Sequence, residues 1–414
     1  MKTILVLLHG AADLPHPKLN NLTPFEAAET PHLDNLAKNG RTGIIYPVAP
    51  NVAPQSDIAI IALLGYDPYK YFSGRGPLEA LGVGINLEGD FLALRTNFAT
   101  ADDDNEILRR RVGRTLTAKE AKELEKAINE NVKLPVPFIF KHTIEHRGVL
   151  VLKGKFSAEI TNVDPGYKKE GPFKVAQSSK ESYVQRAMPL EKEAHETAII
   201  INEFVENARE VLKNHSINQE RKRNGLPEAN ILLLRDAGNK LPELPRKEGW
   251  ATISPLPLEK GISRLAGIDI LPFEYSACVR SCDSYKYFYE NLDLTIQKSI
   301  ELIKENFDNY EFFLINIKET DIPGYDGLPH HRKKMLEIID QTLIPHLKNF
   351  NAKIVITCNR STPCIRRKHT YHPVPLLIFD GKEKDDVERF TEHACRFGSL
   401  GQIKGKELIK LIYK

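Results

Sequence analysis

Short apolar runs recur along the chain and are separated by polar or turn-forming residues. They cover residues 4–8, 231–234, 312–317, 354–356 and 374–379. Runs of this length, bounded by turn or charged residues, are typical of buried strands in a parallel sheet. Longer stretches with helical patterning lie at 284–305 and 330–347. Strands that alternate with long helices predict a doubly wound α/β layer.

The central part of the chain has a different pattern. Residues 117–132 predict an exposed amphipathic helix that begins with a capping box, because Thr117 is followed three residues later by Glu120. Residues 146–153 favour a strand, and residues 160–186, rich in Lys, Gly, Ser and Pro, predict a long loop. A chain of 414 residues is long enough for two or three compact units. A discontinuous two-domain protein fits this pattern.

The first apolar run leads into a polar turn that starts with His9 and Gly10. Residues that follow a parallel strand lie at the carboxyl edge of the sheet. The active sites of open α/β sheets are found at this edge. Further on, Thr23-Pro24 and Thr30-Pro31 have the form of helix starts, and Gly40 suits a helix end.

Composition and charge exclude several classes of protein. The 58 basic and 55 acidic side chains leave a net charge of only +3, so nothing favours nucleic acid or an anionic membrane as a partner. An anion site, if present, must be local. The five cysteines (Cys278, Cys282, Cys358, Cys364 and Cys395) lack CxxC spacing, which argues against a disulfide framework or a zinc finger and favours a reducing cytoplasm. No apolar run approaches the ~20 residues that a membrane-spanning helix needs.

Four blocks, in order along the chain, resemble the archaeal-type cofactor-independent phosphoglycerate mutases of the alkaline-phosphatase-like superfamily. The first two read TPFEAAETPHLDNLAKNGRTGIIYPVAPNVAPQSD at 23–57 and LLGYDPYKYFSGRGPLEALGVG at 63–84. The third has TNFATADDD and RRRVGR within 96–114, and the fourth has RSTPC and HPVPLLI within 360–378. Combinations this long are far more specific than a single short motif.

The resemblance implies a fold, a reaction and a cofactor. It implies a phosphatase-like doubly wound core formed by residues 1–88 and 249–414, with a smaller α+β substrate-binding domain inserted at 89–248. It implies an isomerase of glycolysis that interconverts 3-phosphoglycerate and 2-phosphoglycerate through a phosphoserine. The implied cofactor is a divalent metal (manganese, magnesium or cobalt), here as one ion or none. The implied partner is a phosphorylated small molecule, and the oligomeric state stays open.

Seven positions match the family's nucleophile and metal ligands. Ser56 matches the nucleophile, although taken alone it would read as a helix N-cap. Asp321 and His369 match ligands that this chain retains. The other four positions are substituted and are His9, Asn359, Tyr325 and Arg360.

The substitutions change what the site can bind. His9 and Asn359 stand where the family has carboxylates and could still ligate a metal. Tyr325 and Arg360 stand where the family has histidines. A tyrosine needs deprotonation to become a good ligand, and a guanidinium has no lone pair to give. We therefore expect that these two residues do not ligate.

The substrate side of the family pattern is better preserved. The residues that we expect to bind phosphate or carboxylate are Arg75, Arg110, Arg111, Arg114, His146, Arg147 and Lys260. Three functions stay open: a mutase with a rearranged metal set, an inactive family member that binds a phosphorylated small molecule or regulates an active relative, and a hydrolase of another phosphate or sulfate ester. His330, His331 and His372 are candidates for a rearranged metal site.

Overall fold

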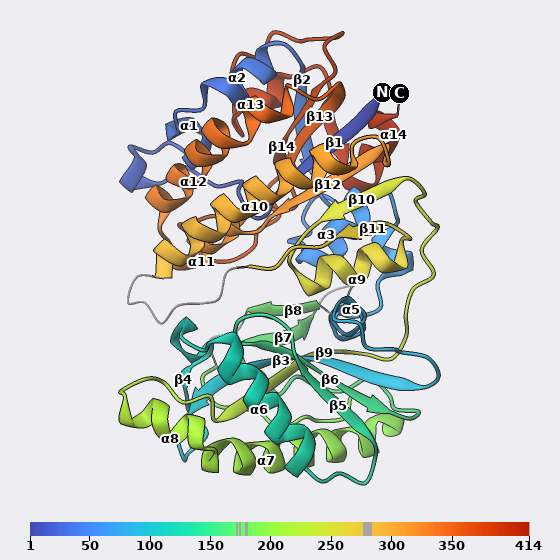
Figure 1. Cartoon of the computed structure of the whole chain (residues 1–414), viewed down its shortest axis with the longest axis vertical. Helices are drawn as coiled ribbons and strands as arrows, with labels where there is room; N and C mark the ends of the chain where they lie inside the picture. The colour runs from blue at the N-terminus through green and yellow to red at the C-terminus, as the bar shows by residue number, and fades with distance from the viewer. Residues whose placement is uncertain (171–172, 174, 179–180, 276–283, 414) are drawn as a thin grey trace.

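An eight-stranded sheet runs through the larger, upper body in the computed structural model of the chain (Figure 1). The structure describes residues 1–170, 173, 175–178, 181–275 and 284–413. From one edge to the other, the strands are β11 (Asp269–Leu271), β10 (Trp250–Ile253), β12 (Phe312–Ile317), β1 (Lys2–Leu8), β13 (Ala352–Cys358), β14 (Val374–Phe379), β2 (Arg41–Tyr46) and β15 (Gly401–Lys404).

The strand directions confirm most of the predicted parallel sheet. β11, β10, β12, β1 and β13 pair in parallel, and β1 lies between β12 and β13. All five residues of the first apolar run, 4–8, are buried, as expected for a strand with helices on both faces. The prediction for 374–379 is wrong in direction, because β14 is antiparallel to both β13 and β2.

Helices flank this sheet on both sides (Figure 1). The predicted helix at 284–305 is confirmed as α10 (Ser284–Asn306). The prediction at 330–347 is confirmed in type, but the structure divides it into α12 (Pro329–Thr342) and α13 (Ile344–Leu347). Pro345 lacks the N–H that a continuous helix would need, and it lies instead in the first turn of a new helix. The other helices of this body are α1 (Pro24–Ala27), α2 (Pro31–Lys38), α3 (Ser56–Leu63), α4 (Pro68–Tyr71), α5 (Arg75–Gly82), α9 (Pro257–Leu265), α11 (Ile322–Asp326) and α14 (Leu408–Ile412).

A five-stranded antiparallel sheet forms the lower body. Its strands are β3 (Phe91–Ala101), β4 (Ile107–Arg109), β5 (Phe138–His142), β6 (Arg147–Lys153) and β9 (Ile231–Gly238). The apolar run at 231–234 is therefore a buried strand, as predicted, but not a strand of the parallel core. It pairs with β3 in the antiparallel sheet, since periodicity alone does not tell which sheet a buried strand joins.

The α-helices that the structure describes in the lower body are α6 (Ala118–Asn131), α7 (His195–Asn214) and α8 (Ser216–Arg223). Figure 1 shows α6 and α7 on the face of the antiparallel sheet that points away from the upper body. The predicted capping box is confirmed, because the side chains of Thr117 and Glu120 bond each other's backbone N–H. The predicted loop at 160–186 is wrong in part, since it contains the hairpin β7 (Tyr167–Glu170) and β8 (Val175–Ser178).

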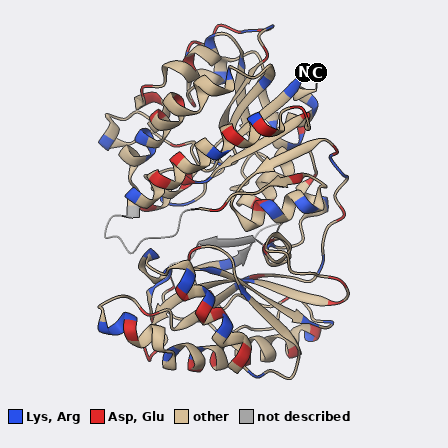
Figure 2. Ribbon diagram, viewed as in Figure 1, with Lys and Arg blue, Asp and Glu red and all other residues tan. Residues whose placement is uncertain are grey.

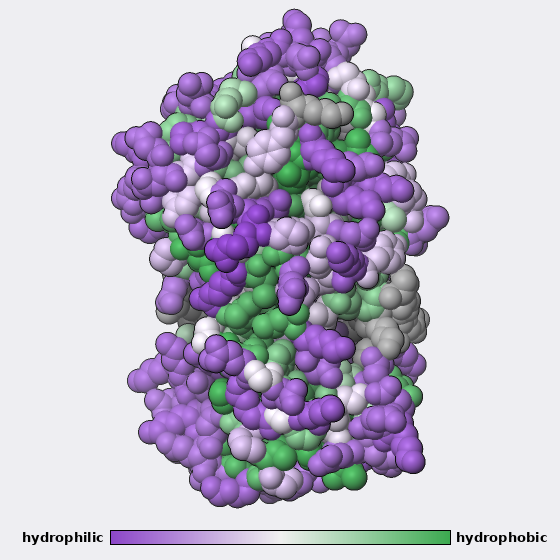
Figure 3. All heavy atoms as spheres, turned by 90° about the vertical axis from the view of Figure 1, so that its right-hand side faces the viewer, coloured by the Kyte–Doolittle hydropathy of each residue, from purple (hydrophilic) through white to green (hydrophobic). Residues whose placement is uncertain are grey.

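The two bodies have separate hydrophobic cores, which fits an α/β core with an α+β insertion. All five strands of the antiparallel sheet lie between residues 91 and 238. The boundaries at 88/89 and 248/249 stay a prediction. Seen from the side, hydrophilic side chains cover most of this face, and a large group of hydrophobic ones lies at mid-height (Figure 3).

The surface charges, the apolar character of the helices and the cysteines bear on the expectations from composition. Lys and Arg are interspersed with Asp and Glu over the surface helices (Figure 2). Among the described helices, none is long and apolar enough to cross a membrane. Cys358, Cys364 and Cys395 are buried free thiols, whereas Cys278 and Cys282 lie outside the described residues.

Glu392 gives this fold a testable pH dependence. Its carboxylate accepts hydrogen bonds from the Asp13 N–H at 2.9 Å and the Thr23 hydroxyl at 2.7 Å. Burial raises the pKa of Glu392 to about 7, against the effect of these two donors. The folded chain therefore binds this proton more tightly than the unfolded chain does, and stability is lost as the pH rises from about 4.5 to about 7.

We expect Glu392→Gln to remove this loss. We compare the free energy of unfolding of the variant with that of the unmodified protein. The variant's value minus the unmodified protein's value should be roughly 1–3 kcal/mol larger at pH 8 than at pH 5. Urea unfolding at the two pH values measures the difference. A difference that does not change with pH would show that Glu392 titrates normally.

Candidate active site

Three neighbouring strands of the core sheet end at one edge, and a polar segment follows each of them. His9 follows β1, Lys318 and Asp321 follow β12, and Asn359 and Arg360 follow β13. β1 pairs in parallel with both β12 and β13. Because the carboxyl ends of parallel strands lie together, residues from opposite ends of the chain meet here.

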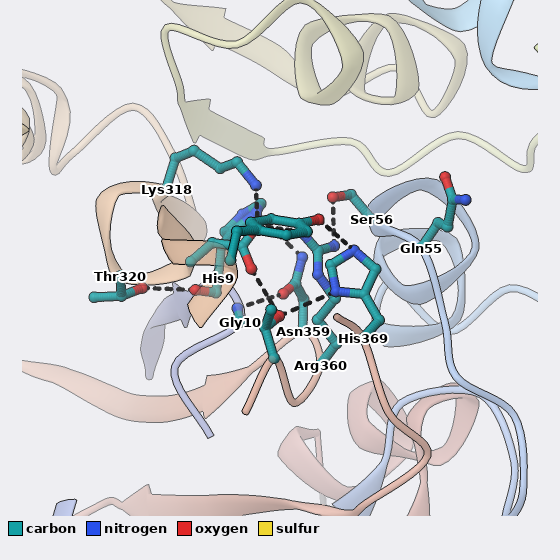
Figure 4. Close-up of polar contacts among 12 residues, drawn as sticks. His9, Gly10, Gln55, Ser56, Lys318, Thr320, Asn359, Arg360 and His369 are labelled. Atoms are coloured by element: carbon teal, nitrogen blue, oxygen red, sulfur yellow. Dashed lines mark hydrogen bonds and ion pairs between the residues drawn. The ribbon is translucent and has the colours of Figure 1, made fainter. Parts of the chain in front are cut away.

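Arg360 lies at the centre of this edge, and its side chain is 1% exposed. Its Nη1 donates to Ser56 Oγ at 2.5 Å, and its Nη2 donates to Asp321 Oδ2 at 2.6 Å. Lys318 Nζ contacts the same carboxylate oxygen at 2.5 Å. Figure 4 shows Ser56 and Arg360 turned toward each other. One carboxylate therefore faces two cations, and the three charged groups together are positive.

Burial and ion pairing act in opposite directions on these groups. Burial alone would raise the pKa of Asp321, but Arg360 and Lys318 hold this pKa well below its usual range. Burial lowers the pKa of Lys318 to about 8, although Asp321 opposes the shift. Asp321 is therefore ionised at neutral pH, and most Lys318 side chains are protonated.

His9 is neutral and already fully hydrogen-bonded. Burial, together with the nearby Lys318 and Arg360, lowers the pKa of His9 to about 3. Its Nε2 lies 3.1 Å from Asn316 Oδ1, and its Nδ1 lies 3.1 Å from Asn359 Nδ2. An amide nitrogen can only donate, so Nδ1 accepts and Nε2 carries the hydrogen. Glu259 lies 3.8 Å from Nδ1, but a neutral ring makes no ion pair with it.

A second chain of hydrogen bonds links Tyr325 to Asp321. The Tyr325 hydroxyl lies 2.7 Å from His369 Nε2, and His369 Nδ1 lies 3.0 Å from Thr362 Oγ1. Thr362 donates to Asp321 Oδ1 at 2.7 Å. Because the threonine hydrogen points to the carboxylate, His369 donates from Nδ1 and accepts from the tyrosine at Nε2. Burial and Arg360 lower the pKa of His369 well below its usual value, so the ring is neutral.

Ser56 is the first residue of α3 and lies 4% exposed at the same edge. The N-cap position is held by Gln55, without a side-chain cap bond. The structure therefore does not support the reading of Ser56 as the cap. Gln55 instead accepts a hydrogen bond from Arg75 Nη1 at 2.6 Å.

A cavity of about 940 Å³ opens at this edge and extends to the lower body. Eleven Lys and Arg side chains and five Asp and Glu side chains line it. Ser56, Asp321 and Arg360 line one side, and residues of β3, β6, β7 and β9 line another. The chain is nearly neutral overall, but this cavity is strongly basic.

The structure brings together most of the residues predicted to bind substrate. The cavity lining includes Arg75, Arg110, Arg111, Arg114, His146 and Arg147. Lys260 is not part of the lining. Sequence reasoning missed further residues there, among them Glu79, Arg95, Tyr167, Arg235, Glu259 and Lys318. Lys318 directly follows an apolar strand that runs parallel to β1, and this placement could have marked it as a candidate.

Comparisons with known proteins identify the family. The family model described as 2,3-bisphosphoglycerate-independent phosphoglycerate mutase matches residues 37–218. The mutase of that name from Thermococcus gammatolerans is 38% identical over 99% of this chain and 96% of its own, and the one from Methanopyrus kandleri is 36% identical over 99% and 95%. This chain belongs to the 2,3-bisphosphoglycerate-independent phosphoglycerate mutase family.

Solved structures agree with this assignment. A protein from Pyrococcus horikoshii superposes with a TM-score of 0.76 at 30% identity, covering 99% of this chain and 96% of its own. The cofactor-independent phosphoglycerate mutase from Thermoplasma acidophilum gives 0.60 at 31% identity, covering 100% and 99%. The predicted fold class of this family member is therefore confirmed.

Membership of the family implies metal-dependent chemistry, yet the residues at this edge do not fit a metal. Both ring nitrogens of His9 and of His369 are already hydrogen-bonded to protein groups. Asn359 gives its carbonyl oxygen to the Gly10 N–H, at 3.1 Å. Both oxygens of Asp321 are occupied, one of them by two cations. A divalent ion would have to displace these contacts next to a guanidinium and an ammonium group.

The rearranged site that the other histidines suggested is not formed. Within the described ranges, no group of three or more His, Cys, Asp or Glu residues could hold a metal ion. His331 Nδ1 bonds the Tyr289 hydroxyl at 2.7 Å, and His372 Nδ1 bonds the Thr370 hydroxyl at 2.9 Å. These histidines have structural partners instead.

Gly10 makes the close approach of β1 to Asp321 possible. Its φ is +58°, and a Cβ at this position would lie 1.9 Å from Asp321 Oδ1. We expect Gly10→Ala to lower the free energy of unfolding by about 2–4 kcal/mol, because the left-handed backbone and the clash both cost energy. Gly84→Ala is the control, since φ there is +81° and nothing lies within 4 Å. It should cost only about 1–2 kcal/mol. Equal losses in urea unfolding would contradict the proposed clash.

Proposed function

We propose that this chain binds phosphoglycerate in the basic cavity and transfers its phosphoryl group between the 2- and 3-hydroxyls through Ser56. The observation that carries the proposal is the placement of the buried Ser56 hydroxyl on the wall of a cavity lined by eleven basic side chains. The names of the full-length relatives support the same reaction.

The charge and dimensions of the cavity suit this ligand. Phosphoglycerate carries a carboxylate and a phosphate group, and guanidinium groups bind both well. A cavity of about 940 Å³ falls in the range of small-molecule sites. The lining arginines come from both bodies, so a bound ligand can be held at both ends.

The transfer through Ser56 needs no additional reactant. In the first step a bond forms between Ser56 Oγ and phosphorus while the bond from phosphorus to the glycerate oxygen breaks, and the serine proton passes to that oxygen. The glycerate then reorients in the cavity. In the second step its other hydroxyl oxygen forms a bond to phosphorus while the bond from phosphorus to Ser56 Oγ breaks, and the hydroxyl proton passes to Oγ. The cations around Ser56 lower the cost of the charge that develops on the phosphoryl oxygens.

The test is conversion of 3-phosphoglycerate to 2-phosphoglycerate, coupled to enolase. We expect turnover that Ser56→Ala abolishes. Ser182→Ala is the matched control, because Ser182 also lines the cavity but matches no nucleophile, and this variant should keep most of the activity. Equal rates for the unmodified protein and Ser56→Ala would refute the mutase proposal.

A second candidate function is binding of the same ligand without turnover, by an inactive family member. The contact from Arg360 to Ser56 Oγ favours it, because a donated hydrogen bond makes the serine oxygen a weaker nucleophile. The prediction in that case is that 3-phosphoglycerate binds although the coupled assay shows no activity above Ser56→Ala. A cytoplasmic location stays a prediction under both functions.

A further inference from the structure

We propose that Arg360 and Lys318 take over the role of the divalent ions, so that the ligand's phosphate group is bound at this edge without any metal. This inference rests on the proposed phosphoglycerate site and deepens it. It names the groups that hold the phosphate, a dianion, and it concerns binding whether or not turnover follows.

The two cations meet at one carboxylate oxygen. Arg360 Nη2 and Lys318 Nζ both contact Asp321 Oδ2, at 2.6 and 2.5 Å. The same guanidinium reaches Ser56 Oγ. A residue that matches a metal-ligating carboxylate therefore now anchors two protein cations beside the matched nucleophile. Figure 4 shows Lys318 and Arg360 reaching this point from different segments of the chain.

The charges of this cluster do not cancel. Two cations, Arg360 and Lys318, contact the single carboxylate of Asp321. The cluster thus keeps one positive charge at the cavity wall, and Arg75 lines the cavity nearby. Glu259 is the other acidic group close to His9, and its Oε1 lies 3.8 Å from the ring Nδ1. An anion is the ligand that this balance favours.

One N–H donor of the Arg360 guanidinium is unused within the described residues. Arg360 Nε is buried and has no hydrogen-bond partner in the described part of the chain. The same holds for Nε of Arg75 and of Arg147, which also line the cavity. Buried donors without partners are costly, and several of them around one basic cavity indicate an anionic ligand that completes the hydrogen bonding after small side-chain shifts.

The experiment compares ligand binding with and without metal. The purified full chain is titrated with 3-phosphoglycerate in a calorimeter, in EDTA and then in excess Mn²⁺, and with inorganic phosphate as the smaller probe. Metal content is measured by elemental analysis on the same sample. We expect the same affinity in both buffers and no stoichiometric metal.

Variants of Arg360 test its part in the binding. Arg360→Met should weaken binding of both probes by about ten- to a hundredfold, the effect of losing a charge-assisted hydrogen-bonding group. Arg360→Lys should recover part of this loss. Arg389→Met, which removes an arginine whose side chain is 48% exposed, should leave the affinity unchanged. A melting curve of each variant checks that it is folded.

The outcomes separate this inference from the proposed reaction. Binding that requires Mn²⁺, or a metal found at one or two ions per chain, would overturn the inference and leave the mutase proposal standing. Binding in EDTA without turnover would support the inference and refute the mutase proposal. Absence of binding of both probes in both buffers would overturn both.

Discussion

Asp321→Asn is expected to lower the free energy of unfolding by about 3–5 kcal/mol, the cost of removing one partner from a buried ion pair. The side chains of Asp321 and Arg360 are 0% and 1% exposed. Without the carboxylate, Arg360 and Lys318 would lie next to each other with no counter-charge at 2.5–2.6 Å. Asparagine has nearly the same shape as aspartate. The fall in the free energy of unfolding therefore measures the loss of charge and not a change in packing. Urea unfolding at pH 7 measures it.

Two further variants make this expectation specific. Asp67→Asn removes the carboxylate of an exposed pair with Lys406 and should change stability by at most about 1 kcal/mol. The double variant Asp321→Asn, Arg360→Met should lose less than the sum of its two single changes, because the second change removes a cation that the first left unpaired. Additive losses would show that the two side chains do not depend on each other.

The second large effect is a gain of metal binding. Changing His9 and Asn359 to Asp and Arg360 to His places family-type ligands at three substituted positions and removes the central cation. We expect the triple variant to take up manganese, whereas the unmodified chain does not. If the ion reaches a hundred times its dissociation constant, it should stabilise the variant by about 2.7 kcal/mol. Elemental analysis and a melting curve with and without Mn²⁺ measure this.

The matched control keeps Arg360. The double variant His9→Asp, Asn359→Asp has the added carboxylates but retains the guanidinium, so it should bind the ion far more weakly than the triple variant. If the triple variant contains no more metal than the unmodified chain, these positions do not correspond to the family's metal ligands. If the double variant binds as well as the triple variant, Arg360 does not exclude the ion.

Much of the fold could be predicted from local patterns. The apolar runs at 4–8 and 312–317 and the capping box of Thr117 and Glu120 are local signals, and each forms the predicted element. Sheet membership and direction could not be predicted in the same way. The run at 231–234 pairs with β3, and β14 runs antiparallel, because these features depend on where distant segments lie.

The candidate site, too, could be predicted only in part from the sequence. The sequence by itself determined the family, because blocks of residue identity and order can be read directly. From the same blocks it predicted that Ser56, Asp321 and His369 match the nucleophile and two metal ligands, and that Tyr325 and Arg360 replace ligands. These matches stay predictions. Besides these positions, it identified six basic or histidine side chains that line the cavity.

Only the tertiary structure decided what the substituted residues do. It placed Lys318 on the same carboxylate oxygen as Arg360, and it occupied both nitrogens of His9 and His369 with hydrogen bonds. Lys318 and Arg360 lie on different strand ends, 42 positions apart, and Ser56 comes from a third segment. Their contacts depend on the parallel packing of β1, β12 and β13, which brings these loops together at one edge, and no local sequence pattern encodes that geometry.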